Sequence, residues 1–446
     1  MSKLLIKNAK IVNEGKIFDS DVLIENQFII EIAETISHKS SDTNVVDAEG
    51  MYLFPGMIDD QVHFREPGLT HKGDIASESR AAVAGGITSF IEMPNTVPQA
   101  TTQKELEKKF AIAAKTSYAN YSFMFGGTND NLEELLKTDS KNVAGIKLFL
   151  GSSTGNMLVD DESILEKIFS STEMLIAVHC EDEETIKENL NQYIKTFGED
   201  IPVSLHPQIR NSEACFISSS KAVALAKKTG ARLHVFHLST LQEMDLFTNK
   251  IPLVDKKITA EVCVHHLWFN DDDYDDKGTL IKWNPAIKSE KHQKALWKAL
   301  LDNRIDVIAT DHAPHTLEEK RRVYTKSPSG APMVQHALPA LIQFYEKGKI
   351  SLEKIVEKTA HNPAILFQIE KRGFIREGYY ADLVLIDLSK PWTVNKNNIL
   401  YKCGWSPLEG TTFTSRITHT FVNGNHMYQN GVFNDTIKGQ RLEFDR

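Results

Sequence analysis

The chain has 446 residues, of which 41% are hydrophobic and 25% are charged, and its formal net charge is −9. This length can hold one α/β barrel plus a smaller unit, and the composition is that of a globular protein rather than a disordered or fibrous one. Acidic and basic residues are interleaved, so no basic stripe is available to bind nucleic acid or an anionic membrane surface.

The two ends of the chain share one pattern. Residues 1–53 are predicted to form short strands and turns without a long helix, and residues 376–446 return to this pattern, with Asn-Gly pairs that mark tight turns. We therefore expect both ends to build one small composite β-sandwich domain, which flanks a separate unit over residues 54–375.

Eight short apolar runs alternate with helical patterns in this middle segment. Such alternation is typical of βα units on a parallel sheet. The sequence therefore predicts an α/β fold, a (β/α)8 TIM barrel beside the β-sandwich domain. The predicted strands cover residues 57–64, 87–94, 121–126, 144–151, 174–180, 232–239, 258–266 and 306–313. Helices are predicted over 102–115, 211–229 and 290–303, with Asn211 as the N-cap of the second.

Metal-capable side chains stand at the carboxyl ends of four predicted strands, where the active site of a parallel barrel gathers. Imidazole and carboxylate groups suit zinc or a related first-row ion, and their repetition at four strand ends favours a metal site over isolated structural residues. Asp311 can also accept a proton from a metal-bound water, which makes it the general-base candidate. The four residues are His63, His179, His237 and Asp311.

Lys147 lies in an otherwise apolar predicted strand, AGIKLFLG. Burying an unpaired ammonium group is unfavourable, so its pKa is expected to fall. A neutral amine can react with carbon dioxide to form a carbamate, whose two oxygens can bridge two metal ions. The alternative is a lysine paired with a neighbouring carboxylate. Glu92 and Glu261 also lie on predicted strands, and we interpret them as ion-paired or supporting residues rather than ligands.

The four cysteines, Cys180, Cys215, Cys263 and Cys403, are far apart in the sequence and form no CxxC pair. This pattern predicts reduced thiols rather than a disulfide framework. The first residues lack the unbroken apolar region of a signal peptide, and no later run is long enough to span a bilayer. We therefore expect a cytoplasmic protein without a membrane partner.

The sequence resembles the dihydroorotase family of carbamylated-lysine cyclic amidohydrolases over nearly its whole length. The segment PGMIDDQVHFREPG (55–68) is similar to the family signature, in which two histidines separated by one residue precede an Arg-Glu-Pro-Gly turn. Further matches are EMPNT (92–96), AGIKLFL (144–150), AVHCED (177–182), HVFHLS (234–239), AEVCVHH (260–266), WNPAIK (283–288), ATDHAPH (309–315) and GYYADLVLID (378–387).

The resemblance implies reversible hydrolysis and cyclisation between dihydroorotate and N-carbamoyl-L-aspartate in de novo pyrimidine (UMP) biosynthesis. A metal-bound hydroxide would be the nucleophile and Asp311 the general base and acid. An N6-carboxylated Lys147 would bridge two zinc ions, one held by His63 and Asp311 and the other by His179 and His237. The residues implied in substrate binding are Arg65, Asn95, Asn284 and His315, and Ser153 and Thr154 would belong to a mobile lid.

Two positions depart from the family pattern. Gln61 stands where the first histidine is expected, and Val264 replaces a proline usual before the paired histidines. Because an amide oxygen binds zinc far more weakly than an imidazole, Gln61 is expected to be a weak or absent ligand. We therefore predict one tightly bound zinc ion near His179 and His237, and a second that is weaker or only partly occupied.

Two alternative functions stay open. A dihydropyrimidinase or allantoinase would share the barrel and the carbamate but acts on an uncharged ring, whereas Arg65 offers a cation for the carboxylate of dihydroorotate. The missing histidine at Gln61 motivates the second alternative, a non-catalytic scaffold or regulatory partner, for example of an aspartate carbamoyltransferase. Against it, Lys147, His179, His237 and Asp311 are all present. A homodimer and an association with this transferase are the expected protein partners.

Overall fold

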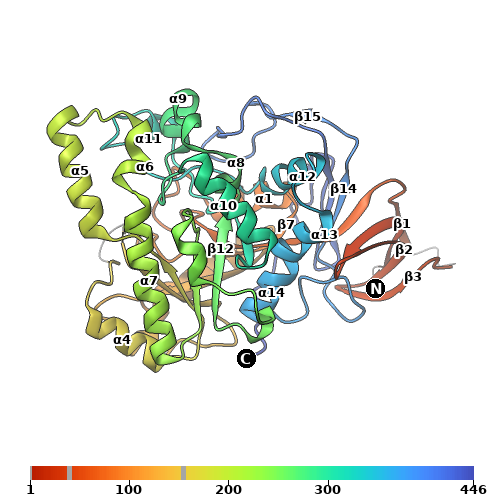
Figure 1. The fold of residues 1–446 in the computed structure, drawn as a ribbon. Helices are drawn as coiled ribbons and strands as arrows, with labels where there is room; N and C mark the ends of the chain where they lie inside the picture. Colours follow the sequence, from red (N-terminus) through yellow and green to blue (C-terminus); the bar gives the residue numbers. More distant parts are fainter. Residues whose placement is uncertain (1–2, 38–42, 152–156) are drawn as a thin grey trace.

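A computed structural model of the chain describes residues 3–37, 43–151 and 157–446. Within them, an eight-stranded parallel sheet and a nine-stranded, mostly antiparallel sheet organise the fold. Figure 1 shows helices arranged around the first sheet, while β1 (Lys3–Asn13), β2 (Lys16–Glu25) and β3 (Phe28–Ala33) of the second sheet project away at the right.

The parallel sheet is a nearly closed barrel whose strands pair in chain order from β6 to β13. A parallel bridge between Val62 and His312 joins the first strand to the segment that follows the last one, and His63 N donates to His312 O at 2.7 Å. The predicted TIM barrel is therefore confirmed. Its strands are β6 (Met57–Val62), β7 (Ile87–Glu92), β8 (Asn120–Gly126), β9 (Gly145–Phe149), β10 (Ile176–His179), β11 (Leu233–Val235), β12 (Ile258–Cys263) and β13 (Val307–Ala309).

Seven of these strands end earlier than the apolar runs that predicted them, and β11, β12 and β13 end three or four residues early. β11 ends at Val235, and the backbone then turns at His237 with a φ of +39°. β12 ends at Cys263, where the short helix α8 (Val264–Trp268) begins. The predictions were wrong at these ends because the apolar residues beyond the strands are buried at the mouth of the barrel without extending the sheet.

The helix predictions are confirmed at all three positions. The side chain of Asn211 accepts a hydrogen bond from Ala214 N at 2.9 Å and caps α7 (Ser212–Thr229). The residue after this helix is its C-cap, Gly230, whose φ is +76°. The longer helices are α1 (Ile75–Ala84), α2 (Gln103–Thr116), α4 (Glu162–Ser171), α5 (Glu183–Phe197), α7 (Ser212–Thr229), α10 (Glu290–Leu301), α12 (Ala337–Glu346), α13 (Leu352–Val356) and α14 (Asn362–Phe367). Four-residue helices are α3 (Leu132–Leu135), α6 (His206–Ile209), α9 (Tyr274–Lys277) and α11 (Leu317–Lys320).

Both ends of the chain contribute to the second sheet. β5 (Tyr52–Pro55), from the N-terminal segment, pairs with β14 (Leu383–Asp387), from the C-terminal segment. The Asn-Gly pairs 423–424 and 430–431 form the turns between β17, β18 and β19, and all four residues have positive φ, as tight hairpin turns require. The remaining strands are β4 (Thr43–Asp47), β17 (Arg416–Val422), β18 (Asn425–Gln429) and β19 (Val432–Phe433), and β15 (Trp392–Thr393) pairs separately with β16 (Thr412–Phe413).

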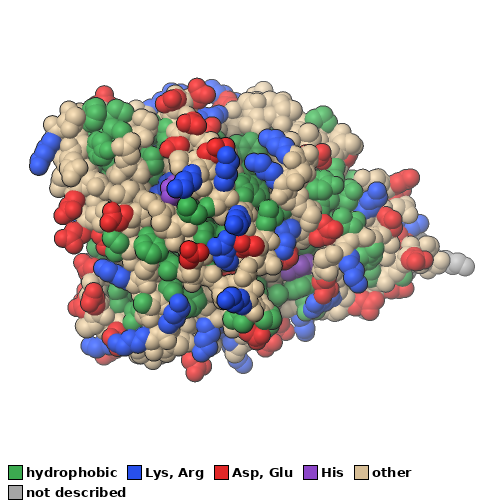
Figure 2. Space-filling model, viewed as in Figure 1, with side chains coloured by type: hydrophobic (Ala, Val, Ile, Leu, Met, Phe, Trp, Pro, Cys, Tyr) green, Lys and Arg blue, Asp and Glu red, His purple; other side chains and the backbone are tan. Residues whose placement is uncertain are grey.

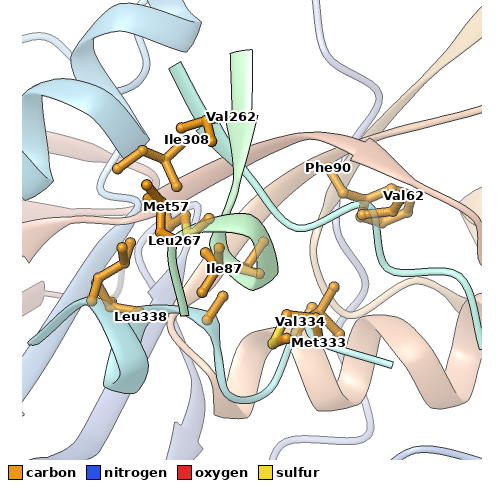
Figure 3. Packing of buried hydrophobic residues seen from close by; sticks show 14 of the residues in the cluster. Met57, Val62, Ile87, Phe90, Val262, Leu267, Ile308, Met333, Val334 and Leu338 are labelled. Atoms are coloured by element: carbon orange, nitrogen blue, oxygen red, sulfur yellow. The ribbon is translucent and has the colours of Figure 1, made fainter. Parts of the chain in front are cut away.

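The main core lies between the barrel strands and the helices around them. Figure 3 shows side chains from β6, β7, β12 and β13 packed against α8, α12 and the segment that precedes α12. Burying such side chains stabilises each strand by about 1.5–3 kcal/mol per large apolar residue, which fixes the strand ends where the polar residues stand. The labelled residues are Met57, Val62, Ile87, Phe90, Val262, Leu267, Ile308, Met333, Val334 and Leu338.

The outer surface carries both signs of charge. On the face drawn in Figure 2, acidic and basic side chains are interspersed over the barrel and the projecting sheet. Among the described helices, none combines the length and the apolar character that a bilayer crossing requires.

Candidate active site

The residues singled out in the sequence converge on one cavity at the carboxyl end of the barrel strands, with a volume of about 280 Å³. A larger hollow of about 790 Å³ lies among α4, α5 and α7 and carries none of them. Ser153 and Thr154 lie outside the described residues. The predicted residues that line the cavity are Gln61, His63, Arg65, Asn95, Lys147, His179, His237, Asn284, Asp311 and His315. Sequence reasoning missed Phe149, Trp283, Ala313 and residues 328–330, which complete the wall.

Four of these residues form two close pairs. His63 Nε2 lies 3.2 Å from Asp311 Oδ1, and His179 Nδ1 lies 2.9 Å from His237 Nε2. Burial lowers the pKa of all three imidazoles, most strongly that of His237. They are therefore neutral near pH 7, and a neutral imidazole keeps a ring nitrogen free to bind a metal.

A buried carboxylate that sequence reasoning missed orients His179. Glu181 Oε2 lies 3.0 Å from His179 Nε2, and Arg210 Nε donates to both carboxylate oxygens of Glu181 at 3.1 Å. Burial alone would raise the pKa of Glu181, but the charge of Arg210 and the contact with His179 hold it well below its usual range. Glu181 is therefore an anion beside His179 Nε2. It favours the tautomer that carries the proton on Nε2 and leaves the lone pair on Nδ1, which faces His237.

Lys147 is 1% exposed, and its Nζ makes no hydrogen bond with the described residues. The nearby rings are those of Phe236, with its centroid 4.3 Å from Nζ, and Phe149, at 4.8 Å. Burial lowers the pKa of Lys147 to about 7, as its apolar strand predicts. No described carboxylate lies within 4.0 Å of Nζ, so the alternative of a directly paired lysine has no support among those residues.

Arg65 provides a buried cation in the cavity wall. Its Nε donates to Pro314 O at 3.0 Å, and its Nη2 lies 2.9 Å from His315 Nε2. Burial lowers the pKa of Arg65 to about 10, so the guanidinium stays charged at neutral pH. Burial and the neighbouring cations lower the pKa of His315 well below its usual value, so this ring is neutral. Its Nδ1 accepts from Lys72 Nζ at 3.0 Å, and its Nε2 donates to Ser329 O at 3.0 Å.

The side chain of Gln61 is 2% exposed and engaged on the protein side of the cavity. Its amide oxygen, the atom that would have to bind a metal, lies 3.7 Å from Cys263 Sγ. This contact places the oxygen beside β12. That Gln61 is a weak or absent ligand stays a prediction.

Three residues of the cavity have backbone conformations that residues other than glycine rarely adopt. The φ angles of Arg65, His237 and Asp311 are +71°, +39° and +43°. Each such residue costs about 1–3 kcal/mol, and residues of this kind cluster at functional sites because the surrounding packing holds them there. No sequence signal marks these positions, since none of the three residues is a glycine.

The chain is similar to known proteins along most of its length. A model of the amidohydrolase family matches residues 52–427. A dihydroorotase of Halobacterium salinarum is 36% identical over 368 residues, 82% of this chain and 84% of that protein. A dihydroorotase of Methanosphaera stadtmanae is 31% identical over 441 residues, 98% of each chain. The solved structure of an L-hydantoinase (dihydropyrimidinase) from Arthrobacter aurescens superposes with a TM-score of 0.93 at 26% identity, covering 99% of this chain and 100% of that one.

The orientation of the His179 ring is predicted to depend on its contact with Glu181. Glu181→Gln removes the anion that fixes the ring, and we expect zinc affinity at His179 and His237 to fall by about 10–100-fold. Isothermal titration of metal-free protein with zinc measures this change. Glu184→Gln, an exposed carboxylate on the same segment, is the matched control and should bind zinc like the unmodified protein. Equal affinities for the two variants would contradict the orienting role of Glu181.

Proposed function

The chain belongs to the amidohydrolase family and groups there with the dihydroorotases, and from this premise we propose that it interconverts dihydroorotate and N-carbamoyl-L-aspartate. The reaction opens or closes a cyclic amide at a C–N bond, in de novo pyrimidine biosynthesis. The observation that carries the proposal is that a buried arginine lies in the same cavity as two pairs of metal-capable side chains. This combination suits a substrate whose ring contains a cyclic amide and carries a carboxylate group.

The donor set of the cavity fits zinc. Members of this family are metal-dependent, and neutral imidazoles with a carboxylate are ligands that zinc prefers. His63 with Asp311 would hold one ion and His179 with His237 the other. We infer that Lys147 is N6-carboxylated and bridges them, because its buried amine is partly neutral and lacks a partner in the described structure. Bound zinc supplies Lewis-acid activation of water and of a carbonyl oxygen.

Asp311 is the proposed proton carrier. Its side chain is 8% exposed and borders the cavity beside His63. In hydrolysis it accepts a proton from the attacking water and delivers it to the ring nitrogen as the C–N bond breaks. The reverse sequence removes a proton from the carbamoyl nitrogen as the ring closes, so protons balance in both directions.

The remaining polar residues of the cavity would bind the substrate. Arg65 and His315 lie in contact, and with Asn95 they form the proposed site for the substrate carboxylate. Asn95 also contacts the metal-capable residues, because its Oδ1 lies 2.8 Å from His63 Nδ1. Asn284 lines the same cavity and is the proposed partner of the ring amide.

A dihydropyrimidinase-type activity is the second candidate, and the similarity to the L-hydantoinase structure favours it. The dihydroorotases are nearer in sequence, at 36% and 31% identity against 26%. Arg65 also gives the cavity a cation that an uncharged ring does not need. The non-catalytic alternative rests on Gln61 alone, whereas the two pairs and Lys147 line the cavity together. The homodimer, the association with an aspartate carbamoyltransferase, the cytoplasmic location and the lid role of Ser153 and Thr154 stay predictions.

Substrate choice is predicted to depend on Arg65. Arg65→Met removes a charge-assisted contact with the carboxylate, so kcat/KM for dihydroorotate should fall by two to three orders of magnitude, about 3–4 kcal/mol. Arg322→Met, at an exposed arginine, is the control and should leave the rate unchanged. A higher rate of the unmodified protein on dihydrouracil or allantoin than on dihydroorotate would refute the proposed function.

Carboxylation of Lys147 is predicted to be essential for the reaction. Lys147→Ala should lose nearly all activity, and short carboxylic acids such as acetate should restore part of it by replacing the missing carboxylate. Lys108→Ala, at an exposed lysine, should need no such rescue. Native mass spectrometry of active, metal-loaded protein should show the added mass of one carbon dioxide, and an unmodified lysine in that sample would overturn the assignment.

Gln61 is predicted to make the two metal positions unequal. The position at His63 and Asp311 lacks a histidine ligand, and loss of supporting contacts alone lowers metal affinity by about 10–100-fold. Zinc titration of chelator-treated protein in bicarbonate buffer should show one tight and one weaker equivalent bound in the cavity. Gln61→His should strengthen the weaker one. Two equivalents of indistinguishable affinity, or no gain in the histidine variant, would contradict this prediction.

A further inference from the structure

A second group of metal-capable side chains lies inside the barrel, apart from the residues that line the cavity. Asp60, on β6, His234, on β11, and Glu261, on β12, are each 0% exposed. Their ligand atoms all lie within 4.8 Å of one another. None of the three residues lines the cavity of the proposed active site. The group therefore needs its own physical explanation.

The distances within this group are those of a coordination sphere. His234 Nε2 lies 3.3 Å from Asp60 Oδ2 and 3.7 Å from Glu261 Oε2. A charge-assisted hydrogen bond from an imidazolium to a carboxylate would be about 2.7–2.9 Å long. Two ligand atoms of a tetrahedral zinc ion, each about 2.0–2.2 Å from the metal, are about 3.3–3.6 Å apart. The observed separations are nearer to the second arrangement.

The hydrogen bonds of His234 direct a lone pair toward both carboxylates. Its Nδ1 lies 2.8 Å from Thr259 Oγ1, and the Thr259 hydroxyl donates to Leu233 O at 3.2 Å. Because that hydroxyl hydrogen is used, Nδ1 carries the proton and donates to Thr259. In the neutral ring, Nε2 then presents its lone pair to two carboxylates, which requires a cation or a further proton between them.

Three of the four carboxylate oxygens in the group lack a hydrogen-bond donor among the described residues. Neither oxygen of Asp60 has a hydrogen-bond partner among the described residues, and the same is true of Glu261 Oε2. The other oxygen, Glu261 Oε1, accepts from His237 N at 3.0 Å and Cys263 Sγ at 3.5 Å. With a neutral imidazole and both carboxylates ionised, the group would have a charge of −2, which a divalent cation neutralises. In the metal-free protein, burial and the charge of Asp60 raise the pKa of Glu261 to about 7, so bound protons are the competing source of neutralisation. Uncompensated buried charge is strongly unfavourable.

We propose that Asp60, His234 and Glu261 bind a divalent cation of the zinc class as a structural metal site, separate from the two positions in the cavity. Each of the three side chains offers one ligand atom, an imidazole nitrogen from His234 and a carboxylate oxygen from Asp60 and from Glu261, and zinc binds both kinds of ligand. The ion would join β6, which bears Gln61, to β11 and β12 across the barrel interior. It would also fix Glu261, which accepts a hydrogen bond from His237 N. This proposal does not depend on the reaction that the cavity catalyses.

The competing occupant is a proton. Burial lowers the pKa of His234, but Asp60 and Glu261 outweigh this effect and raise it to about 9 in the metal-free protein. An imidazolium between two carboxylates would then replace the metal. The metal-bound and the protonated forms of the protein differ in metal content and in X-ray anomalous scattering. Neither measurement depends on enzymatic activity.

The test uses the full chain, expressed with zinc and then dialysed against EDTA, which strips metal from the solvent-connected cavity. We expect about one equivalent of metal to remain, measured by inductively coupled plasma mass spectrometry. The double variant His179→Asn/His237→Asn should keep this equivalent, and Asp60→Asn should lose it. Asp59→Asn is the matched control, because the Asp59 carboxylate is equally buried on β6 but accepts hydrogen bonds from Thr310.

Crystals of the unmodified protein provide the second measurement. Anomalous difference maps at the zinc edge should show a peak bonded to Asp60, His234 and Glu261. Absence of this peak would refute the proposal and identify the occupant as a proton. Retention of the chelator-resistant equivalent by folded Asp60→Asn would refute it as well. If Asp60→Asn does not fold, the anomalous map of the unmodified protein decides the question by itself.

Discussion

The burial of Lys147 is the constraint on which the chemistry of the cavity depends. Its Nζ loses water, approaches the rings of Phe149 and Phe236, and finds no hydrogen-bond partner in the described structure. The same low-polarity surroundings lower the pKa of His63, His179 and His237 and keep these rings neutral. One physical effect, desolvation, therefore turns a set of potential cations into lone-pair donors. In their protonated forms these groups would repel a metal ion, whereas in their neutral forms they can bind it.

Desolvation is useful only because buried partners restrain the donors. Glu181, neutralised by Arg210, fixes the ring of His179, and the backbone at His237 and Asp311 is held at positive φ by the packing around it. Such restraint costs conformational energy locally, which the apolar core beneath the strand ends offsets. The barrel thus acts as a rigid frame, in which strands fixed by their apolar sides present polar side chains at one edge.

The strands and helices of the barrel were predictable because apolar runs and helix caps are local features of the sequence. His63, Lys147, His179, His237 and Asp311 could be singled out because all parallel strands end at the same edge, so position along each strand implies proximity. The contact of Glu181 with Arg210 joins residues 29 positions apart. The group of Asp60, His234 and Glu261 joins β6 to the adjacent strands β11 and β12, to which β6 is connected only through other strands. These arrangements depend on the closure and stagger of the barrel, which local patterns do not encode.

The similarity to an L-hydantoinase structure, at a TM-score of 0.93, shows how little of the substrate preference resides in the fold. A cyclic amide needs activated water and a proton carrier, and a barrel of this kind can supply both at its strand ends. What distinguishes a charged ring from an uncharged one is a cation in the wall, where desolvation makes an unpaired carboxylate costly. Arg65 occupies that position and is already hydrogen-bonded to Pro314 and in contact with His315, so little order has to be created on binding. An uncharged ring would leave this guanidinium buried opposite a group that cannot pair with it, and the cavity therefore disfavours such a ring as well as favouring the carboxylate.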